Sequence, residues 1–263
     1  MHPEPRPDQV RVVIGDVHAA PGGLEALLRH VGAIDVDGNR LDTHFVAQLG
    51  DLLHLGHQTA DADRRTLELG SRWIDLQLLG NHEAFYAFGL DSCWWAGMAS
   101  PDQVHPDVLA ALGRQASDGR WHVAATIDGW LLTHAGVHPV FQPEVGTQAT
   151  VAAHAISSAF AERLANGHRI PVIDRSGPVR GYDPEPGGVL WCDLSEIEPL
   201  AGENAIRQIV GHTPQDAPRM VGERLWAVDG GGGRSGRVSA VVKQPGDDRW
   251  TPVTVDAPDP RVS

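Results

Sequence analysis

The chain is poor in cysteine, with only Cys93 and Cys192 among its 263 residues. Two thiols in a chain of this size argue against a disulfide scaffold, and we expect a reduced, cytoplasmic setting. Long apolar runs are also missing, since none approaches the ~20 residues that a membrane-spanning helix needs. The first ten residues, MHPEPRPDQV, lack the apolar core of a signal peptide. We therefore expect a protein with no membrane segment and no cleaved leader.

Positive charge is scarce as well, because 21 Lys and Arg face 34 Asp and Glu, for a net charge of -13. Such a surface repels the phosphates of duplex nucleic acid, so we expect no partner of that kind. A small phosphorylated substrate is not excluded, because bound metal ions can reverse the local charge of a site. Fourteen histidines stand beside only two tyrosines, and several of the histidines call for a functional explanation.

Strand and helix patterns alternate along the chain. Short apolar runs predict strands at residues 10–14, 44–49 and 74–79, and helical spacing predicts helices at 22–32 and 61–73 between them. This order is typical of βαβ units with a largely parallel sheet.

The second half of the chain adds further predicted elements. Asp128-Gly129 marks a hairpin between strands. The predicted elements are a broken helical region at 84–119, the hairpin strands at 122–127 and 130–133, a long helix at 147–166, a long loop at 169–188, and strands at 206–210, 225–228 and 238–242, with a possible edge strand at 250–255. No long linker interrupts this pattern, so we predict one α/β domain over residues 1–263, with disordered tails at 1–9 and about 256–263.

At the carboxyl ends of five predicted strands, an Asp, Asn or His stands beside a glycine. The segments are GDVH at 15–18, GDLLHLG at 50–56, GNHE at 80–83, THAG at 133–136 and GHTP at 211–214. One such segment is an ordinary turn, but five in one chain favour a shared site, because ligand crevices in open α/β sheets lie at these strand ends. The side chains expected to converge are Asp16, His18, Asp51, Asn81, His134 and His212.

This set of side chains suits two divalent cations. Imidazole and carboxylate ligands favour manganese, iron or zinc over calcium. A carboxylate such as that of Asp51 can bridge two metal ions about 3.5–4 Å apart.

The five segments, in this order, resemble the signature set of the calcineurin-like metallophosphoesterases. GNHE followed by HAG and GHTP is similar to the phosphoprotein phosphatase branch and its bacterial diadenosine tetraphosphatase relatives. The resemblance covers residues 10–243. It implies a four-layer αββα sandwich, classed as α/β or as α+β in some schemes, and hydrolysis of a phosphate ester by a water that two metal ions activate.

The resemblance also implies a role for each residue of the motifs. Asp16 and His18 match the ligands of the first metal, and Asp51 matches the bridging carboxylate. Asn81, His134 and His212 match the ligands of the second metal. His82 matches the general acid, which protonates the leaving oxygen, and Glu83 is implied to orient backbone or ligands rather than to bind metal.

The chain departs from the family at its phosphate-binding positions. The family motif GDxxDRG reads GDLLHLG here, with His54 and Leu55 in place of the Asp and Arg, and Phe85 stands where protein phosphatases carry another Arg. We therefore expect Arg180, and secondarily Arg175, to bind the phosphate from the loop at 169–188. His54 is either a proton relay or extra cation beside His82, or a packed histidine.

The sequence thus predicts a metallophosphoesterase, a hydrolase of phosphate ester bonds that uses two divalent transition metals, manganese before iron or zinc. Its substrate would be a phosphorylated small molecule or a phosphoprotein. An alternative is a dinucleoside polyphosphate pyrophosphohydrolase, whose phosphate leaving group needs less help from an acid. A third hypothesis is a degenerate metal-binding domain that serves as a binding module; the missing arginines favour it and the retained His82 argues against it.

Overall fold

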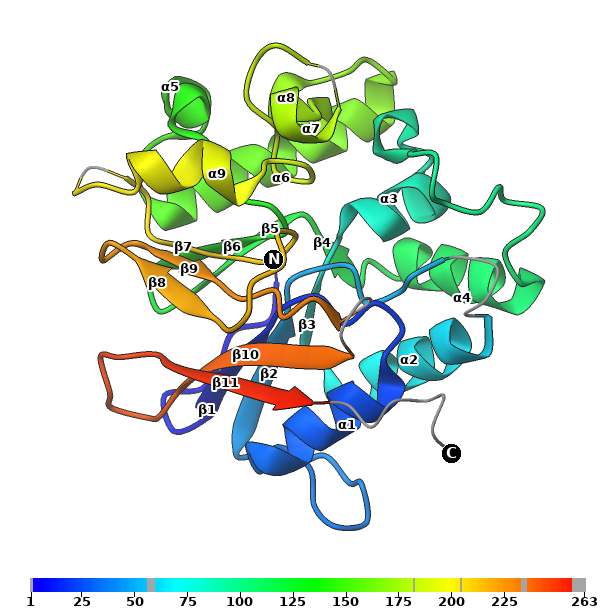
Figure 1. The fold of residues 1–263 in the computed structure, drawn as a ribbon, viewed down its shortest axis with the longest axis vertical. Coiled ribbons are helices and arrows are strands. Elements are labelled where there is room, and N and C mark those ends of the chain that lie inside the picture. The colour runs from blue at the N-terminus through cyan, green and yellow to red at the C-terminus, as the bar shows by residue number, and fades with distance from the viewer. Residues whose placement is uncertain (1, 56–59, 182, 204, 233–235, 257–263) are drawn as a thin grey trace.

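The computed structural model describes residues 2–55, 60–181, 183–203, 205–232 and 236–256, which form two stacked β-sheets with helices on both outer faces (Figure 1). The first sheet has the strand order β11-β10-β1-β2-β3-β4, and the second has the order β5-β6-β7-β9-β8. The first sheet consists of β1 (Val10–Ile14), β2 (His44–Gln48), β3 (Leu76–Leu78), β4 (Trp121–His122), β10 (Arg237–Lys243) and β11 (Thr251–Asp256). The second consists of β5 (Ala124–Ile127), β6 (Trp130–Thr133), β7 (Gln208–Val210), β8 (Arg219–Val221) and β9 (Leu225–Ala227).

Parallel pairing dominates the part of each sheet that carries the motifs. The strands β1, β2, β3 and β4 pair in parallel, while β10 runs antiparallel to β1. In the second sheet β6, β7 and β9 are parallel, and β5 and β8 are antiparallel edge strands. The carboxyl ends of the parallel strands within each sheet therefore meet at one edge.

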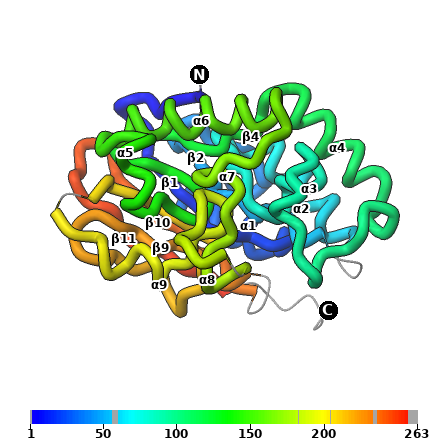
Figure 2. Tube along the Cα trace, turned by 90° about the horizontal axis from the view of Figure 1, so that it is seen from above, coloured from blue at the N-terminus to red at the C-terminus, as the bar shows by residue number. Residues whose placement is uncertain are grey.

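Helices cover the outer face of each sheet. The helices on the side of the first sheet are α1 (Pro21–His30), α2 (Ala60–Trp73), α3 (Asn81–Phe88) and α4 (Pro106–Ser117). Those on the side of the second sheet are α5 (Gln142–Val145), α6 (Ala149–Asn166), α7 (Pro171–Asp174), α8 (Gly177–Arg180) and α9 (Leu194–Ile197). Short 3-10 turns lie at Asp91–Cys93, Pro139–Phe141 and Glu198–Leu200. The view in Figure 2 shows α2, α3 and α4 grouped at one end of the molecule and α5 at the other.

The apolar core explains the layering. Val13 and Phe45 of the first sheet share a buried cluster with Leu132 and Ile209 of the second, so the two sheets pack face to face. The alternate residue Val12 instead packs with the apolar side of α1 in a separate cluster. Because side chains alternate across a strand, each buried strand contributes to both layers. The prediction of a four-layer αββα sandwich is confirmed.

Two local predictions require correction, and one strand was not predicted. Residues 122–127 do not form one strand: His122 pairs with Leu78 in the first sheet, whereas Ala124 pairs with Thr133 in the second, so the chain crosses between the sheets here. The loop expected at 169–188 contains the short helices α7 and α8. The strand β8 has exposed residues and no apolar run, which is why its sequence pattern did not reveal it.

The amino-terminal segment predicted to be disordered makes defined contacts with the loop before β2. Arg6 pairs with the carboxylate of Asp42 at 3.0 Å, and Gln9 donates hydrogen bonds to the carbonyl oxygens of Asp42 and His44. These contacts anchor residues 6–9 beside the first sheet. Most of the predicted carboxyl-terminal tail, residues 257–263, lies outside the described residues.

Candidate metal centre

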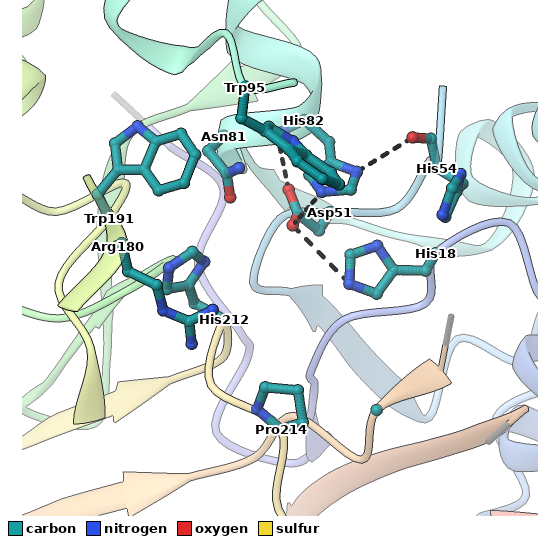
Figure 3. Close-up of a pocket in the computed structure, with 11 residues that line it drawn as sticks. His18, Asp51, His54, Asn81, His82, Trp95, Arg180, Trp191, His212 and Pro214 are labelled. Atoms are coloured by element: carbon teal, nitrogen blue, oxygen red, sulfur yellow. Dashed lines mark hydrogen bonds and ion pairs between the residues drawn. The ribbon is translucent and has the colours of Figure 1, made fainter. Parts of the chain in front are cut away.

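The predicted ligands come from both sheets. Asp16 and His18 follow β1, Asp51 follows β2, and Asn81 opens α3 directly after β3. His134 and His212 follow β6 and β7 of the second sheet. A pocket of about 280 Å³ is open at this place, and several of these side chains line it together with residues from other segments (Figure 3).

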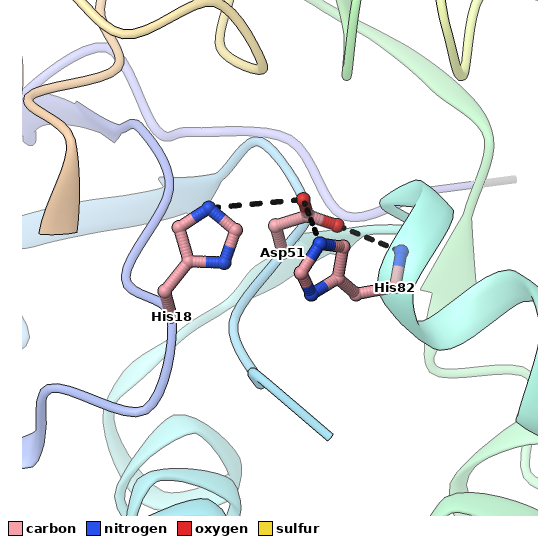
Figure 4. Close-up of side chains that lie close together, drawn as sticks. All are labelled: His18, Asp51 and His82. Atoms are coloured by element: carbon pink, nitrogen blue, oxygen red, sulfur yellow. Dashed lines mark hydrogen bonds and ion pairs between the residues drawn. The ribbon is translucent and has the colours of Figure 1, made fainter. Parts of the chain in front are cut away.

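One carboxylate oxygen lies at the middle of the site. Asp51 Oδ2 is 3.9 Å from His18 Nε2, 3.6 Å from His82 Nε2 and 3.5 Å from His134 Nε2. The other oxygen, Oδ1, accepts a hydrogen bond of 3.0 Å from the backbone N–H of His82 (Figure 4). Asp51 thereby belongs to two compact groups of side chains that could hold a metal ion, one with His18 and His82, the other with His134 and His212.

The second group brings electron-pair donors together. His134 Nε2 lies 3.0 Å from Asn81 Oδ1 and 3.1 Å from His212 Nδ1. His134 Nδ1 lies 3.0 Å from the carbonyl oxygen of Leu49, which can only accept, so the imidazole proton belongs on Nδ1. The Nε2 lone pair then faces an amide oxygen and a carboxylate, an arrangement that a cation stabilises.

Asp16 completes the site from the side of His18. Its Oδ1 accepts the backbone N–H of His212 at 2.9 Å, and its Oδ2 lies 3.5 Å from His18 Nε2. Asp16 Oδ2 and His212 Nε2 are two of the twelve buried side-chain atoms of the described residues that have no hydrogen-bond partner. Buried polar atoms are almost always paired, so these two atoms mark positions that suit a metal ion.

The electrostatics of the site favour binding of a cation. Burial raises the pKa of Asp16 to about 7. Burial, with the negative charges of Glu83 and Asp16, raises the pKa of Asp51 well above its ordinary value. Burial lowers the pKa of His134 to about 3, so its imidazole stays neutral. A divalent cation favours both the ionised carboxylate and the neutral imidazole, and the residues present therefore fit such an ion.

Glu83 supports the backbone behind Asp51. Its Oε2 accepts the N–H groups of Asp51 at 3.1 Å and Gly80 at 3.2 Å, and its Oε1 accepts that of Leu53 at 2.8 Å. These bonds hold Asp51 at a φ of 52°, a left-handed conformation that costs energy for a non-glycine residue. Glu83 thus binds backbone at the position where the sequence predicted a supporting residue.

Two motif glycines make room for the carboxylates. A Cβ atom at Gly80 would collide with the carboxylate of Asp51, and a Cβ atom at Gly211 would collide with that of Asp16. The recurrence of glycine in the five motifs is explained at these two positions by close packing against a neighbouring motif.

The segment around His54 differs from the family pattern in an informative way. His82 Nδ1 lies 3.1 Å from the backbone carbonyl oxygen of His54, not from its side chain. The His54 ring lines the pocket, with its centroid 5.9 Å from that of His82. Asp63 of α2, which no motif indicated, accepts the N–H of His54 at 2.7 Å and that of Leu55 at 3.1 Å. Asp63 therefore positions the carbonyl that His82 contacts.

The two arginines proposed from sequence have different locations. Arg180 lines the pocket beside His212 and pairs with Asp193 at 2.8 Å (Figure 3). Arg175 instead pairs with Glu185 at 2.9 Å and lies 5.4 Å from the centre of the Phe141 ring. Arg180 therefore lies at the pocket, whereas Arg175 is not among the residues that line it.

Two indoles, those of Trp95 and Trp191, line the pocket but were not among the site residues predicted from the sequence. The Trp95 ring lies 5.8 Å from the His82 ring, and the Trp191 ring lies 5.8 Å from that of His212. Trp191 directly follows the glycine-led segment 188–190, which was a usable signal. Trp95 lies in an irregular segment after α3, where spacing carries no such information.

The comparisons with known proteins concern the fold. No family model matches the chain, and no curated protein matches its sequence. A solved structure named as a candidate diadenosine tetraphosphatase is 18% identical, with a TM-score of 0.56, over 97% of this chain and 96% of the other. A cold-active protein-tyrosine phosphatase of a psychrophilic Shewanella species is 19% identical, with a TM-score of 0.60, over 96% of this chain and 83% of the other.

A third similar structure is a protein serine/threonine phosphatase from Saccharomyces cerevisiae with similarity to human phosphatase PP5. It is 15% identical, with a TM-score of 0.53, over 96% of this chain and 82% of the other.

In the described part of this chain, no helix has the length and apolar character needed to cross a bilayer. The strand order and these three likenesses together show that the chain shares the two-sheet fold of these phosphatase structures.

Proposed function

We propose that the chain is a metal-dependent phosphoesterase with a binuclear centre. The observation that carries this proposal is the position of Asp51 Oδ2, within 3.9 Å of imidazole nitrogens from both His18 and His134. Asp16, His18 and Asp51 would hold the first ion. Asp51 would also share the second ion with Asn81, His134 and His212.

The donor set suits manganese, with iron or zinc as alternatives. When bound, such ions neutralise phosphate charge and lower the pKa of a water molecule that can attack phosphorus. Glu83 and the glycines keep the carboxylates in place, so the site is organised before substrate arrives.

His82 is suited to deliver a proton to the leaving oxygen. The His54 carbonyl accepts from Nδ1, so Nε2 of the protonated ring is directed toward the pocket. Burial lowers the pKa of His82 well below its ordinary value, and a bound phosphate would oppose that shift through its negative charge. The same side chain argues against the binding-module hypothesis, because a binder needs no acid at this position.

Arg180 would bind the phosphate in place of the two absent family arginines. Its guanidinium lines the pocket, and Asp193 and Thr213 hold it at 2.8 Å and 3.3 Å. A guanidinium held by other residues loses little freedom on binding a phosphate. One arginine in place of two predicts weak affinity for small phosphate monoesters.

The second candidate is hydrolysis of dinucleoside polyphosphates. The indole of Trp191, beside His212, favours it, since bases stack on aromatic side chains. The similar structure named as a candidate diadenosine tetraphosphatase also favours it.

A substrate panel tests these proposals. The purified protein with manganese should hydrolyse at least one of an aryl phosphate, an aryl phosphodiester, phosphopeptides and diadenosine tetraphosphate. Faster turnover of diadenosine tetraphosphate than of every monoester would select the second candidate. No turnover on the whole panel, with two manganese ions bound, would reject the enzymatic proposal and leave the binding module.

A further inference from the structure

We propose that Trp95 determines specificity by stacking on the aromatic ring of an aryl phosphate monoester, so that the preferred leaving group is a phenol. This inference rests on the proposed phosphoesterase function. It concerns the leaving-group side of the same pocket.

The first argument is the place of the indole. Trp95 lies beside His82, with ring centroids 5.8 Å apart and planes 41° from each other (Figure 3). If His82 protonates the leaving oxygen, the group attached to that oxygen extends toward Trp95. The indole therefore contacts the part of the substrate that departs.

The second argument is distance along the substrate. In an aryl ester the ring is bonded directly to the leaving oxygen, so it lies within the ~4.5–7 Å centroid separation of a stacked pair. In a nucleotide a ribose separates the base from the phosphate, which carries the base past an indole this close to His82. The cavity of about 280 Å³ is also slightly smaller than the ~300–1,000 Å³ of typical ligand pockets, which suits a small ester.

The third argument is that the indole is held in place. A Cβ atom at Gly97 would overlap the Trp95 ring, so this glycine provides the surface on which the ring rests. The N–H of Met98 donates to the carbonyl of Trp95 at 3.0 Å, and the N–H of Ala99 donates to that of Leu55 at 3.4 Å. The segment is thus tied to the motif that carries Asp51, and a fixed ring loses little entropy on stacking.

The segment is also anchored on its other side. Ser92 donates to Asp174 at 2.6 Å, and Asp174 is paired with the buried Arg163 at 2.9 Å. A tryptophan placed at the surface by chance needs no such support. The neighbouring Trp94 provides the contrast, because it is 53% exposed and is not among the pocket-lining residues, whereas Trp95 is 38% exposed and lines the pocket.

The test compares phenyl phosphate with cyclohexyl phosphate, which has a ring of similar size but no π-face. The measured quantity is the ratio of their kcat/KM values in each variant, because the intrinsic reactivity of the two esters cancels between variants. Trp95→Leu should lower the phenyl preference by roughly 3- to 10-fold. Trp95→Phe should retain most of it, and Gly97→Ala should reduce it by displacing the indole.

Trp94→Leu is the matched control and should leave the ratio at the wild-type value. The inference would be overturned if Trp94→Leu and Trp95→Leu lowered the phenyl preference equally. It would also be overturned if Trp95→Leu left the ratio unchanged. Hydrolysis of a phosphotyrosine peptide should also slow in Trp95→Leu, because its leaving group is a phenol as well. A loss of kcat/KM in Trp95→Leu that is confined to diadenosine tetraphosphate would show that a base stacks on the indole. This result would also overturn the inference.

A binding measurement separates this inference from the proposed function. Calorimetric titration of the manganese-loaded protein with phenylphosphonate and methylphosphonate requires no turnover. Phenylphosphonate should bind more tightly, and Trp95→Leu should remove the difference. Trp95-dependent binding without hydrolysis of any ester would reject the proposed function and support the inference. Hydrolysis that does not depend on Trp95 would support the proposed function and reject the inference.

Discussion

The imidazole of His82 is hydrogen-bonded through Nδ1 to the backbone carbonyl oxygen of His54, at 3.1 Å. In the family motif that this segment resembles, residue 54 would be an aspartate, whose carboxylate pairs with the histidine. The carbonyl supplies an acceptor in the same neighbourhood without a full negative charge. His82 is therefore oriented, but its protonated form is stabilised less than a carboxylate would stabilise it.

Replacing His82 tests its role as a proton donor. General acid catalysis contributes ~10²–10⁴-fold, so His82→Asn should lower kcat by that factor on alkyl phosphates, whose leaving oxygen needs a proton. The loss should be smaller on aryl phosphates. Steady-state rates on both ester classes provide the measurement.

Metal content is the control for this variant, since His82 Nε2 lies only 3.6 Å from Asp51 Oδ2. We expect His82→Asn to retain the wild-type metal content. Loss of one ion would identify His82 as a ligand. An equal rate loss on both ester classes, with metal retained, would indicate that His82 stabilises charge on the phosphoryl group instead.

Asp51→Asn should remove at least one metal ion per chain. The substitution keeps the shape of the side chain but removes the charge that faces imidazoles of both groups. Elemental analysis after incubation with manganese should find up to two ions in the wild type. Asp61→Asn, on the exposed side of α2, should match the wild type. A wild-type protein that retains no manganese would disprove the binuclear centre.

Arg180→Ala should raise KM for an aryl phosphate about tenfold, the effect expected when a charge-assisted hydrogen bond to phosphate is lost. Arg175→Ala is the matched control, because Arg175 pairs with Glu185 outside the pocket and comes from the same region of the chain. Thermal unfolding of both variants would show whether the Asp193 contact matters for stability. An unchanged KM in Arg180→Ala would show that Arg180 does not bind the phosphate and only pairs with Asp193.

The metal-free protein should lose stability as pH rises from about 6.5 to 8. Burial raises the pKa values of Asp16, Glu83 and Asp229 to about 7, above those of the unfolded chain, so the folded state binds these protons more tightly. Their contribution is complete below pH ~4 and is lost as pH rises through about 7. Buried histidines such as His134 have lowered pKa values and oppose this trend only below their unfolded value of 6.5.

Thermal unfolding of chelator-treated protein across this range provides the measurement. Manganese should reduce the pH dependence, because it stabilises the ionised carboxylates without a proton. A melting temperature of the metal-free protein that increases from pH 6.5 to 8 would contradict this prediction.

The architecture could largely be predicted from local pattern. Apolar runs such as that of β1 end in a glycine and a metal-binding residue, and parallel strands in one sheet bring such ends together. The long helix α6 was evident from its sequence pattern and ends at Gly167, in a left-handed conformation. The local pattern could not show that residues 122–127 are divided between the two sheets. The strand neighbours of a short apolar run depend on the fold of the whole chain.

The candidate metal ligands could be predicted from the sequence, because their motifs stand at strand ends whose location follows from local periodicity. The other residues at the site could be identified only from the folded chain. Arg180 and Arg175 are near in sequence, yet only Arg180 lines the pocket. Trp95 and Asp63 reach the site from an irregular segment and from α2. Their contributions depend on packing between segments distant in sequence, and no local spacing encodes that packing.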